Sequence, residues 1–171
     1  MAGFRVAVFS LEVLHTRRLI NHMDITVALG GGGAKGNAHF GVLRRLEKEG
    51  FRIKGVAGTS YGGLVAALYA LGYSPDELED LFASVDQTQY YGHAPEDGPS
   101  LVGLAGVTRL LEEKIGARTF ADLKLPCVLT AVDLKSGNEV FLKNGRLVDA
   151  ILATIAMPGV FPARHIDGLE L

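Results

Sequence analysis

Two glycine-rich segments, each set between a short apolar run and a helical pattern, constrain the fold of this chain more than any other feature. The first, residues 30–36 (GGGGAKG), follows the short apolar run 24–29, and the second, residues 58–63 (GTSYGG), follows residues 53–57, which we interpret as a second strand. Such runs indicate strands, and strands that alternate with helices predict an α/β fold with a largely parallel central sheet. Both turns then lie at the carboxyl ends of neighbouring strands, the edge at which ligands bind. The run 24–29 suits a strand buried on both faces.

The helical patterns between and after these strands complete the alternation. His39, Val42, Leu43 and Leu46 recur at helical spacing and predict one buried face for a helix over residues 34–49. Residues 64–71 are apolar all round, which indicates a buried helix. Further helices are expected at 74–84, 104–115 and 146–155, strands at 127–132 and 139–142, a long surface loop at 86–103, and a hairpin at 164–171 around Asp167 and Gly168.

Composition and charge narrow the classes of function. The chain has 171 residues, one domain's worth, and its 48% hydrophobic and 21% charged residues are ordinary for a globular protein. A net charge of −2 gives no general attraction to nucleic acid. Cys127 is the single cysteine, which excludes a disulfide framework and a cysteine-based zinc site. The 22 glycines exceed the usual share of about 7% and point to special backbone positions.

The first residues are expected to lie outside the fold. They precede a second methionine, Met23, and they lack the basic start, clean apolar core and small-residue cleavage site of a signal peptide. We interpret residues 1–23 as an N-terminal extension and residues 24–171 as the domain; a short amphipathic anchor is the alternative for the extension. No apolar run is long enough to cross a bilayer. We therefore expect a cytoplasmic protein, with peripheral contact to a membrane left open.

Residues 30–36 have the form of an anion-binding loop, because consecutive glycines let backbone N–H groups converge and the following helix adds its positive dipole end. A P-loop requires Ser or Thr after the lysine, whereas Gly36 follows Lys35 here. A dinucleotide fingerprint fits at Gly31, Gly33 and Gly36, but the next strand ends without the acidic residue that binds the ribose. An oxyanion hole needs only the N–H groups and a nucleophile nearby.

Residues 58–62 supply a nucleophile in the pattern Gly-x-Ser-x-Gly. A strand, this turn and an apolar helix make up a nucleophile elbow, in which the sharp turn presents the Ser60 hydroxyl at the start of the helix. Together with an oxyanion-type loop one strand earlier, the pattern predicts a serine hydrolase.

A base for this serine is harder to find in the sequence. His39 falls on the apolar face of its helix, His93 in the long loop and His165 near the hairpin, and two further histidines precede the domain. Asp133 is expected to open a turn and Asp149 to lie on the polar face of a helix, positions at which most aspartates are solvated. None of these residues has a convincing catalytic arrangement.

Four stretches resemble the bacterial patatin-like phospholipases, and the resemblance spans residues 24–171. They are ALGGGGAKGNAHFGVLRRLE (28–47), GVAGTSYGGLVAALYALG (55–72), PCVLTAVDLKSGNEVFL (126–142) and ATIAMPGVFP (153–162). The resemblance implies a three-layer α/β/α fold and hydrolysis of acyl-ester lipids without a metal or cofactor. It also implies that Ser60 is the nucleophile of a Ser–Asp dyad without histidine. Backbone N–H groups of Gly31, Gly32 and Gly33 would stabilise the oxyanion.

The dyad aspartate is the point at which the sequence departs from this family. Its members carry a D-G-[GA] motif, whereas Asp167 and Gly168 are followed by Leu169. In the family a P-G-x-F-P stretch, here 158–162, leads to a hairpin whose turn is often x-G, and the motif follows that turn. We therefore interpret Asp167 as the turn residue and expect the dyad motif just beyond Leu171, in a C-terminally incomplete domain.

Three functions stay open at this point. The leading one is a lipid acyl hydrolase of phospholipase A or carboxylesterase type, with Asp167 as the dyad base if it is not the turn residue. The second is a catalytically silent lipid- or acyl-binding fragment that lacks its general base. The third is a nucleotide-binding domain that uses the glycine loop.

Overall fold

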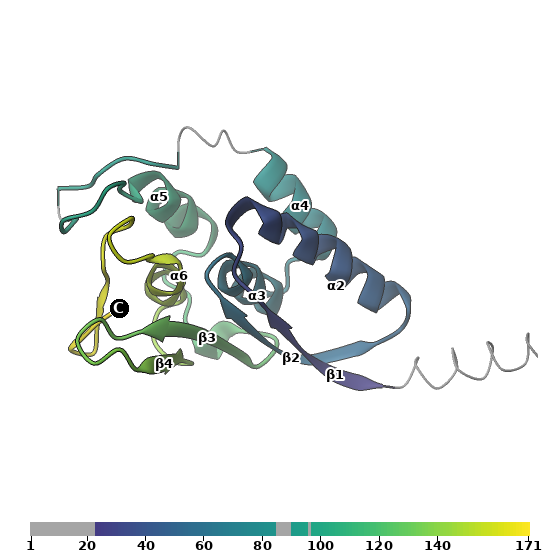
Figure 1. The fold of residues 1–171 in the computed structure, drawn as a ribbon. Coiled ribbons are helices and arrows are strands. Elements are labelled where there is room, and N and C mark those ends of the chain that lie inside the picture. The colour runs from purple at the N-terminus through teal and green to yellow at the C-terminus, as the bar shows by residue number, and fades with distance from the viewer. Residues whose placement is uncertain (1–22, 85–89, 96) are drawn as a thin grey trace, which may run out of the picture.

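A four-stranded sheet with helices packed against it forms the centre of the molecule (Figure 1). The structure is a computed structural model and describes residues 23–84, 90–95 and 97–171. The strands lie in the order β1 (Asp24–Leu29), β2 (Arg52–Thr59), β3 (Cys127–Val132) and β4 (Glu139–Leu142). The pairs β1–β2 and β2–β3 are parallel and β3–β4 is antiparallel. The predicted α/β fold with a largely parallel central sheet and flanking helices is confirmed, consistent with the three-layer α/β/α class.

The described part of the chain contains five α-helices. They are α2 (Ala38–Lys48), which follows the short 3₁₀ helix η1 (Gly33–Asn37), α3 (Tyr61–Leu71), α4 (Pro75–Ala83), α5 (Ala105–Lys114) and α6 (Leu147–Ile155); a further 3₁₀ turn is η3 (Phe120–Asp122). In Figure 1 these α-helices lie on one side of the sheet. This follows from the topology, because strands that succeed one another in one direction with right-handed crossovers carry their connections on the same face.

Helix α3 forms the centre of the core because it is apolar on every side. It packs against β1, β2 and β3 and against α6. Val65 and Leu68 of α3 and Ile151 and Leu152 of α6 are almost completely buried. Each such side chain contributes about 1.5–3 kcal/mol through removal of its surface from water. The helix ends at Gly72, whose φ of 106° is accessible to glycine.

The opposite face of the sheet stays open in the described residues, and this corrects the prediction for β1. Burial alternates along β1, with Thr26 and Ala28 exposed and Leu29 buried, so the strand is not buried on both faces. Phe141 of β4, on the same open face, is 60% exposed. The reason is the one-sided placement of the helices.

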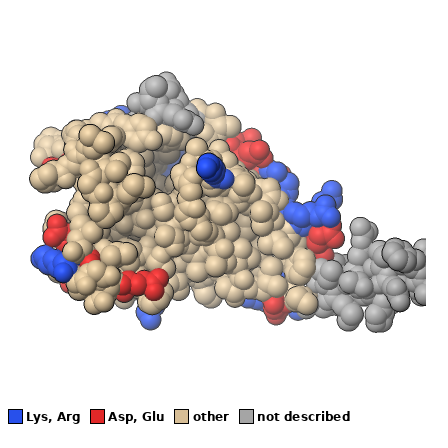
Figure 2. Space-filling view, viewed as in Figure 1, with Lys and Arg blue, Asp and Glu red and all other residues tan. Residues whose placement is uncertain are grey.

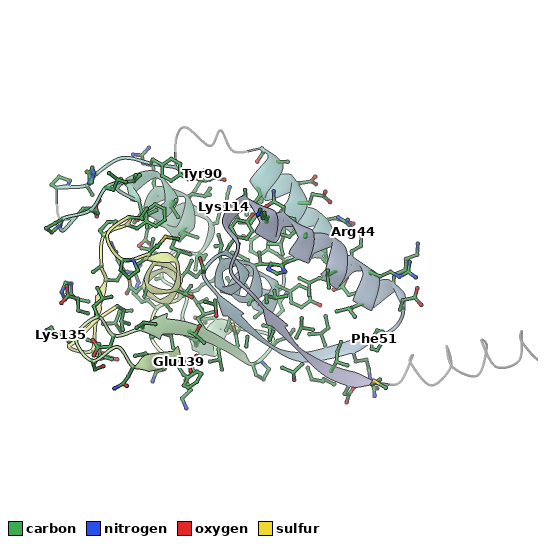
Figure 3. All side chains as sticks on the ribbon, viewed as in Figure 1. Arg44, Phe51, Tyr90, Lys114, Lys135 and Glu139 are labelled. Atoms are coloured by element: carbon green, nitrogen blue, oxygen red, sulfur yellow. The ribbon has the colours of Figure 1, made fainter. Side chains whose placement is uncertain are left out.

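The buried stripe of α2 also differs from its prediction. Val42 is 49% exposed, whereas Phe40 is buried and stacks on Phe82 of α4 with ring centroids 5.6 Å apart. Arg44 bonds to Asp76 on α4 at 2.6 Å (Figure 3). Helix α2 packs mainly on α4. Because of this contact, the buried face of α2 includes Phe40 in place of the predicted His39 and Val42.

The predicted C-terminal hairpin is present. Strand β5 (His165–Ile166) pairs with β6 (Leu169–Glu170). Asp167 and Gly168 form the turn with φ values of 50° and 81°, as a two-residue hairpin loop of the primed type requires. The Leu134 N–H donates to the Glu170 carbonyl at 2.7 Å, which holds the hairpin against the β3–β4 turn. Across the described ranges, every helix is too short or too polar to cross a bilayer.

Candidate active site

Ser60 alone makes the turn between β2 and α3. Its backbone has φ 54° and ψ −126°, a conformation that a residue with a Cβ rarely adopts. Such a conformation costs on the order of 1–3 kcal/mol and persists where surrounding structure enforces it. The strand–turn–helix arrangement predicted for residues 58–62 is therefore present, with the strained serine that a nucleophile elbow requires.

Glycine on either side of this serine allows the chain to turn so sharply. A Cβ at Gly58 would lie 2.3 Å from the carbonyl oxygen of Gly62. A Cβ at Gly62 would lie 2.2 Å from the carbonyl oxygen of Leu29. Both contacts are with backbone atoms, which cannot move aside as a flexible side chain can. The close approach of the first turn of α3 to the end of β2 thus depends on Gly58, and its close approach to the end of β1 depends on Gly62.

Thr154 of α6 holds the elbow in place, and the sequence offered no signal for this role. The Ser60 N–H donates to Thr154 Oγ1 at 2.9 Å, and the Thr154 hydroxyl donates to the Thr130 carbonyl on β3 at 2.6 Å. Thr154 is only 8% exposed. The buried hydroxyl therefore joins the elbow, α6 and β3.

We expect Thr154→Val to lower the free energy of unfolding by about 1–3 kcal/mol, because valine keeps the shape but removes the partner of the Ser60 N–H and one hydrogen bond to the Thr130 carbonyl. Urea denaturation followed by circular dichroism measures this loss. The matched control is Thr26→Val on the open face of the sheet, which should change the stability by less than about 0.5 kcal/mol. Equal effects of the two substitutions would contradict the role of Thr154.

The glycine loop lies directly beside Ser60. A Cβ at Gly31 would lie 3.2 Å from Ser60 Cβ and 3.9 Å from its Oγ. The N–H groups of Gly31 and Gly32 donate to no acceptor within the described residues, and Gly33 borders the same pocket as Ser60. The structure therefore brings the two predicted glycine segments together and leaves donors free near the hydroxyl.

Tyr61, the residue after the serine, fastens the loop to α3. Its hydroxyl donates to Asn37 Oδ1. A Cβ at Gly36 would lie 2.2 Å from the Tyr61 ring, so the ring occupies the space that a side chain would need. Burial raises the pKa of Tyr61 to about 12, so its hydroxyl remains a hydrogen-bond donor at neutral pH. Loop and elbow thus form one packed unit.

A pocket of about 250 Å³ opens from Ser60. Its walls are mainly apolar side chains of α3, α4, α5 and residues 155–161, including Leu64, Leu68 and Phe161. Tyr90 and Lys114, both labelled in Figure 3, also line it. A mostly apolar pocket beside a hydroxyl suits the hydrocarbon part of an ester.

The histidines take no part in this arrangement within the described residues. His39 Nε2 donates to the Gly30 carbonyl at 2.9 Å and so supports the loop rather than the serine. No hydrogen bond between described residues joins the Ser60 hydroxyl to His93, His165 or any other imidazole. Cys127 offers no alternative nucleophile, because burial raises the pKa of its thiol to about 12.

The carboxylates singled out in the sequence also lie elsewhere. Asp133 accepts hydrogen bonds from the Ser136 hydroxyl and backbone, which lower its pKa, and it closes the β3–β4 turn. Asp149 is paired with Arg146 at 3.5 Å on the surface. Asp167 is exposed in the hairpin turn, and no hydrogen bond in the described part of the chain joins it to Ser60.

Comparison with known proteins agrees with this geometry. The family model described as patatin-like phospholipase matches residues 27–171. The chain belongs to the patatin-like phospholipase family. The NTE family protein Rv1063c of Mycobacterium tuberculosis is 33% identical over 147 residues, which are 84% of this chain and 40% of that protein.

Two further relatives show how much of a longer protein this chain matches. YqhO of Bacillus subtilis is 35% identical over 140 residues, 71% of this chain and 48% of that protein. Lysophospholipase NTE1 of Meyerozyma guilliermondii is 41% identical over 69 residues, 40% of this chain and 5% of that protein. The chain therefore spans less than half the length of these curated relatives.

A solved structure shares the fold of this patatin-like chain. Full-length ExoU from the type III secretion system of Pseudomonas aeruginosa, solved in complex with SpcU, aligns with a TM-score of 0.52. The alignment covers 78% of this chain and 38% of ExoU at 19% identity. At that identity the likeness supports the fold alone.

Proposed function

We propose that the protein is a serine lipid acyl hydrolase of phospholipase A or carboxylesterase type. One observation carries the proposal: the strained Ser60 opens onto an apolar pocket beside free backbone donors of a glycine loop. Membership of the patatin-like phospholipase family and a relative named as a lysophospholipase support an ester lipid as the substrate. Contact with a membrane surface would then be peripheral.

In the proposed reaction, the Ser60 oxygen attacks the carbonyl carbon of the acyl ester. The carbonyl oxygen becomes an oxyanion, which the N–H groups of Gly31, Gly32 and Gly33 stabilise. The proton of the hydroxyl passes through the general base to the leaving alcohol as the ester bond breaks. Water then attacks the acyl-serine, and its proton returns to Ser60 as the fatty acid is released. The pocket holds the acyl chain throughout.

We propose that Asp167 is not the general base. It occupies the β5–β6 turn with an exposed side chain, a position that its φ of 50° and the neighbouring glycine explain. The family resemblance implies a dyad aspartate in a D-G-[GA] motif. We propose that residues 24–171 are part of a patatin-like domain, in which Leu169 stands after Asp167 and Gly168 where that motif requires Gly or Ala.

Fluorophosphonate labelling tests the proposed function, because the reagent reacts only with an activated serine. In the protein expressed to its natural C-terminus, mass spectrometry should locate the adduct on Ser60. Ser136→Ala, which removes a hydroxyl bonded to Asp133, should leave the adduct unchanged. A folded protein that binds a fatty-acid analogue without forming an adduct would be the silent acyl-binding alternative. Nucleotide binding without an adduct would indicate the third function.

Replacement of histidines separates a Ser–Asp dyad from a Ser–His–Asp triad. His93→Ala and His165→Ala should each leave the rate of labelling at Ser60 unchanged, because no imidazole takes the serine proton in the proposed reaction. A catalytic histidine would instead be revealed by a rate loss on the order of 10⁴-fold with the fold preserved. Stopped-time labelling with in-gel fluorescence measures the rates, and circular dichroism checks the fold.

A further inference from the structure

Three exposed apolar side chains gather at the mouth of the Ser60 pocket, and we call Tyr91, Leu101 and Met157 the mouth patch. Their exposed fractions are 54%, 76% and 57%. Tyr91 and Met157 also line the pocket, so the patch is continuous with its interior. Leu101 is the most exposed large hydrophobic residue in the described part of the chain.

Backbone hydrogen bonds between residues 101–102 and residues 159–160 hold the mouth patch in shape. The Leu101 N–H donates to the Gly159 carbonyl at 3.2 Å, and the Val102 N–H donates to the Val160 carbonyl at 2.8 Å. The ring of Tyr91 stacks on Phe161 with centroids 6.4 Å apart. A patch ordered before it meets its partner loses little conformational entropy on binding.

The charge on this face indicates the kind of partner. Figure 2 shows a hollow in the face, and most of the atoms around it are neither basic nor acidic. Tyr91, Leu101 and Met157 are uncharged, and Lys114 is the one charged residue among the described residues that line the pocket, so the patch itself presents no cationic group to an anionic surface. Tyrosine with aliphatic neighbours suits the boundary between lipid headgroups and hydrocarbon. There the apolar ring contacts hydrocarbon and the hydroxyl contacts water and headgroups.

We propose that the mouth patch docks on the surface of a phospholipid bilayer with zwitterionic headgroups. Leu101 and Met157 would enter the outer hydrocarbon, and the pocket mouth would then face the lipid layer. A single lipid could pass its acyl chain along Tyr91 and Met157 into the pocket without crossing water, which removes the cost of exposing that chain. This inference rests on the proposed function for its physiological meaning, although docking itself can be measured without catalysis.

Sedimentation with phosphatidylcholine vesicles tests the proposal. The measurement uses the Ser60→Ala protein, so that vesicles stay intact. Leu101→Asp should lower the partition coefficient about tenfold, because it replaces the burial of a leucine side chain with that of a charge. Leu101→Phe should retain binding. The matched control is Phe141→Asp on the open face of the sheet, where the side chain is 60% exposed, and it should leave the partition coefficient unchanged.

With the serine restored, Leu101→Asp should reduce hydrolysis of vesicle lipid by a similar factor and leave hydrolysis of a soluble short-chain ester unchanged, because Leu101 does not line the pocket. Unchanged partitioning of Leu101→Asp, or an equal loss with Phe141→Asp, would overturn the proposal. So would binding that requires anionic lipid and disappears in salt. If the proposed function is wrong but the docking proposal is right, fluorophosphonate forms no adduct at Ser60 and the protein still binds the vesicles.

Discussion

Ser60→Ala is expected to abolish hydrolysis of p-nitrophenyl esters by the protein expressed to its natural C-terminus. The loss should be on the order of 10⁴-fold or more, because in the proposed reaction the hydroxyl oxygen forms the acyl-enzyme. The stability should change by less than about 0.5 kcal/mol, since one oxygen is removed and the bond from the Ser60 N–H to Thr154 remains. Absorbance at the p-nitrophenolate band and urea denaturation measure the two quantities.

A second variant at this position tests the strain of the elbow separately from its chemistry. Ser60→Gly should be inactive as well, yet more stable than Ser60→Ala by about 1 kcal/mol. Glycine relieves about 1–3 kcal/mol of backbone strain at φ 54° and loses about 0.5–1 kcal/mol in conformational entropy. Activity retained in either variant would exclude Ser60 as the nucleophile, and equal stability of the two would argue against strain.

Gly62→Ala should unfold or severely destabilise the protein, with a loss of at least about 3 kcal/mol and of all labelling at the serine. The added methyl group would lie 2.2 Å from the Leu29 carbonyl oxygen and 2.5 Å from that of Gly30. Relief of this contact requires α3 to move away from β1. That movement separates the elbow from the glycine loop.

Gly41→Ala in α2 is the matched control for Gly62→Ala, because both glycines are helical. A Cβ at Gly41 meets no atom within 4 Å. Alanine there should stabilise the helix by about 0.5–1 kcal/mol. Thermal melting of both variants decides the point: if Gly62→Ala melts like the parent protein, the close approach of α3 to β1 is not required.

The sequence alone determined the local features of this protein. Each glycine segment, with the strand before it and the helix after it, lies within a few consecutive residues, so residue type and spacing specify the turn directly. The elbow at Ser60 was therefore predictable from residues 58–62, and the C-terminal turn from Asp167 and Gly168. The capping box that begins α4 at Ser74 is a further local signal that the structure contains.

Only the tertiary structure decided how these local units meet. Thr154 binds the Ser60 N–H although it lies 94 residues away in the sequence. A single hydroxyl group produces no periodic pattern, so the sequence alone does not reveal this contact. The open face of the sheet and the exposure of Val42 were likewise decided by neighbours. Burial depends on what packs against a residue, and right-handed crossovers in one direction placed the helices of the described chain on one face. Periodicity reveals that a face is apolar, but the packed partner determines whether it is covered.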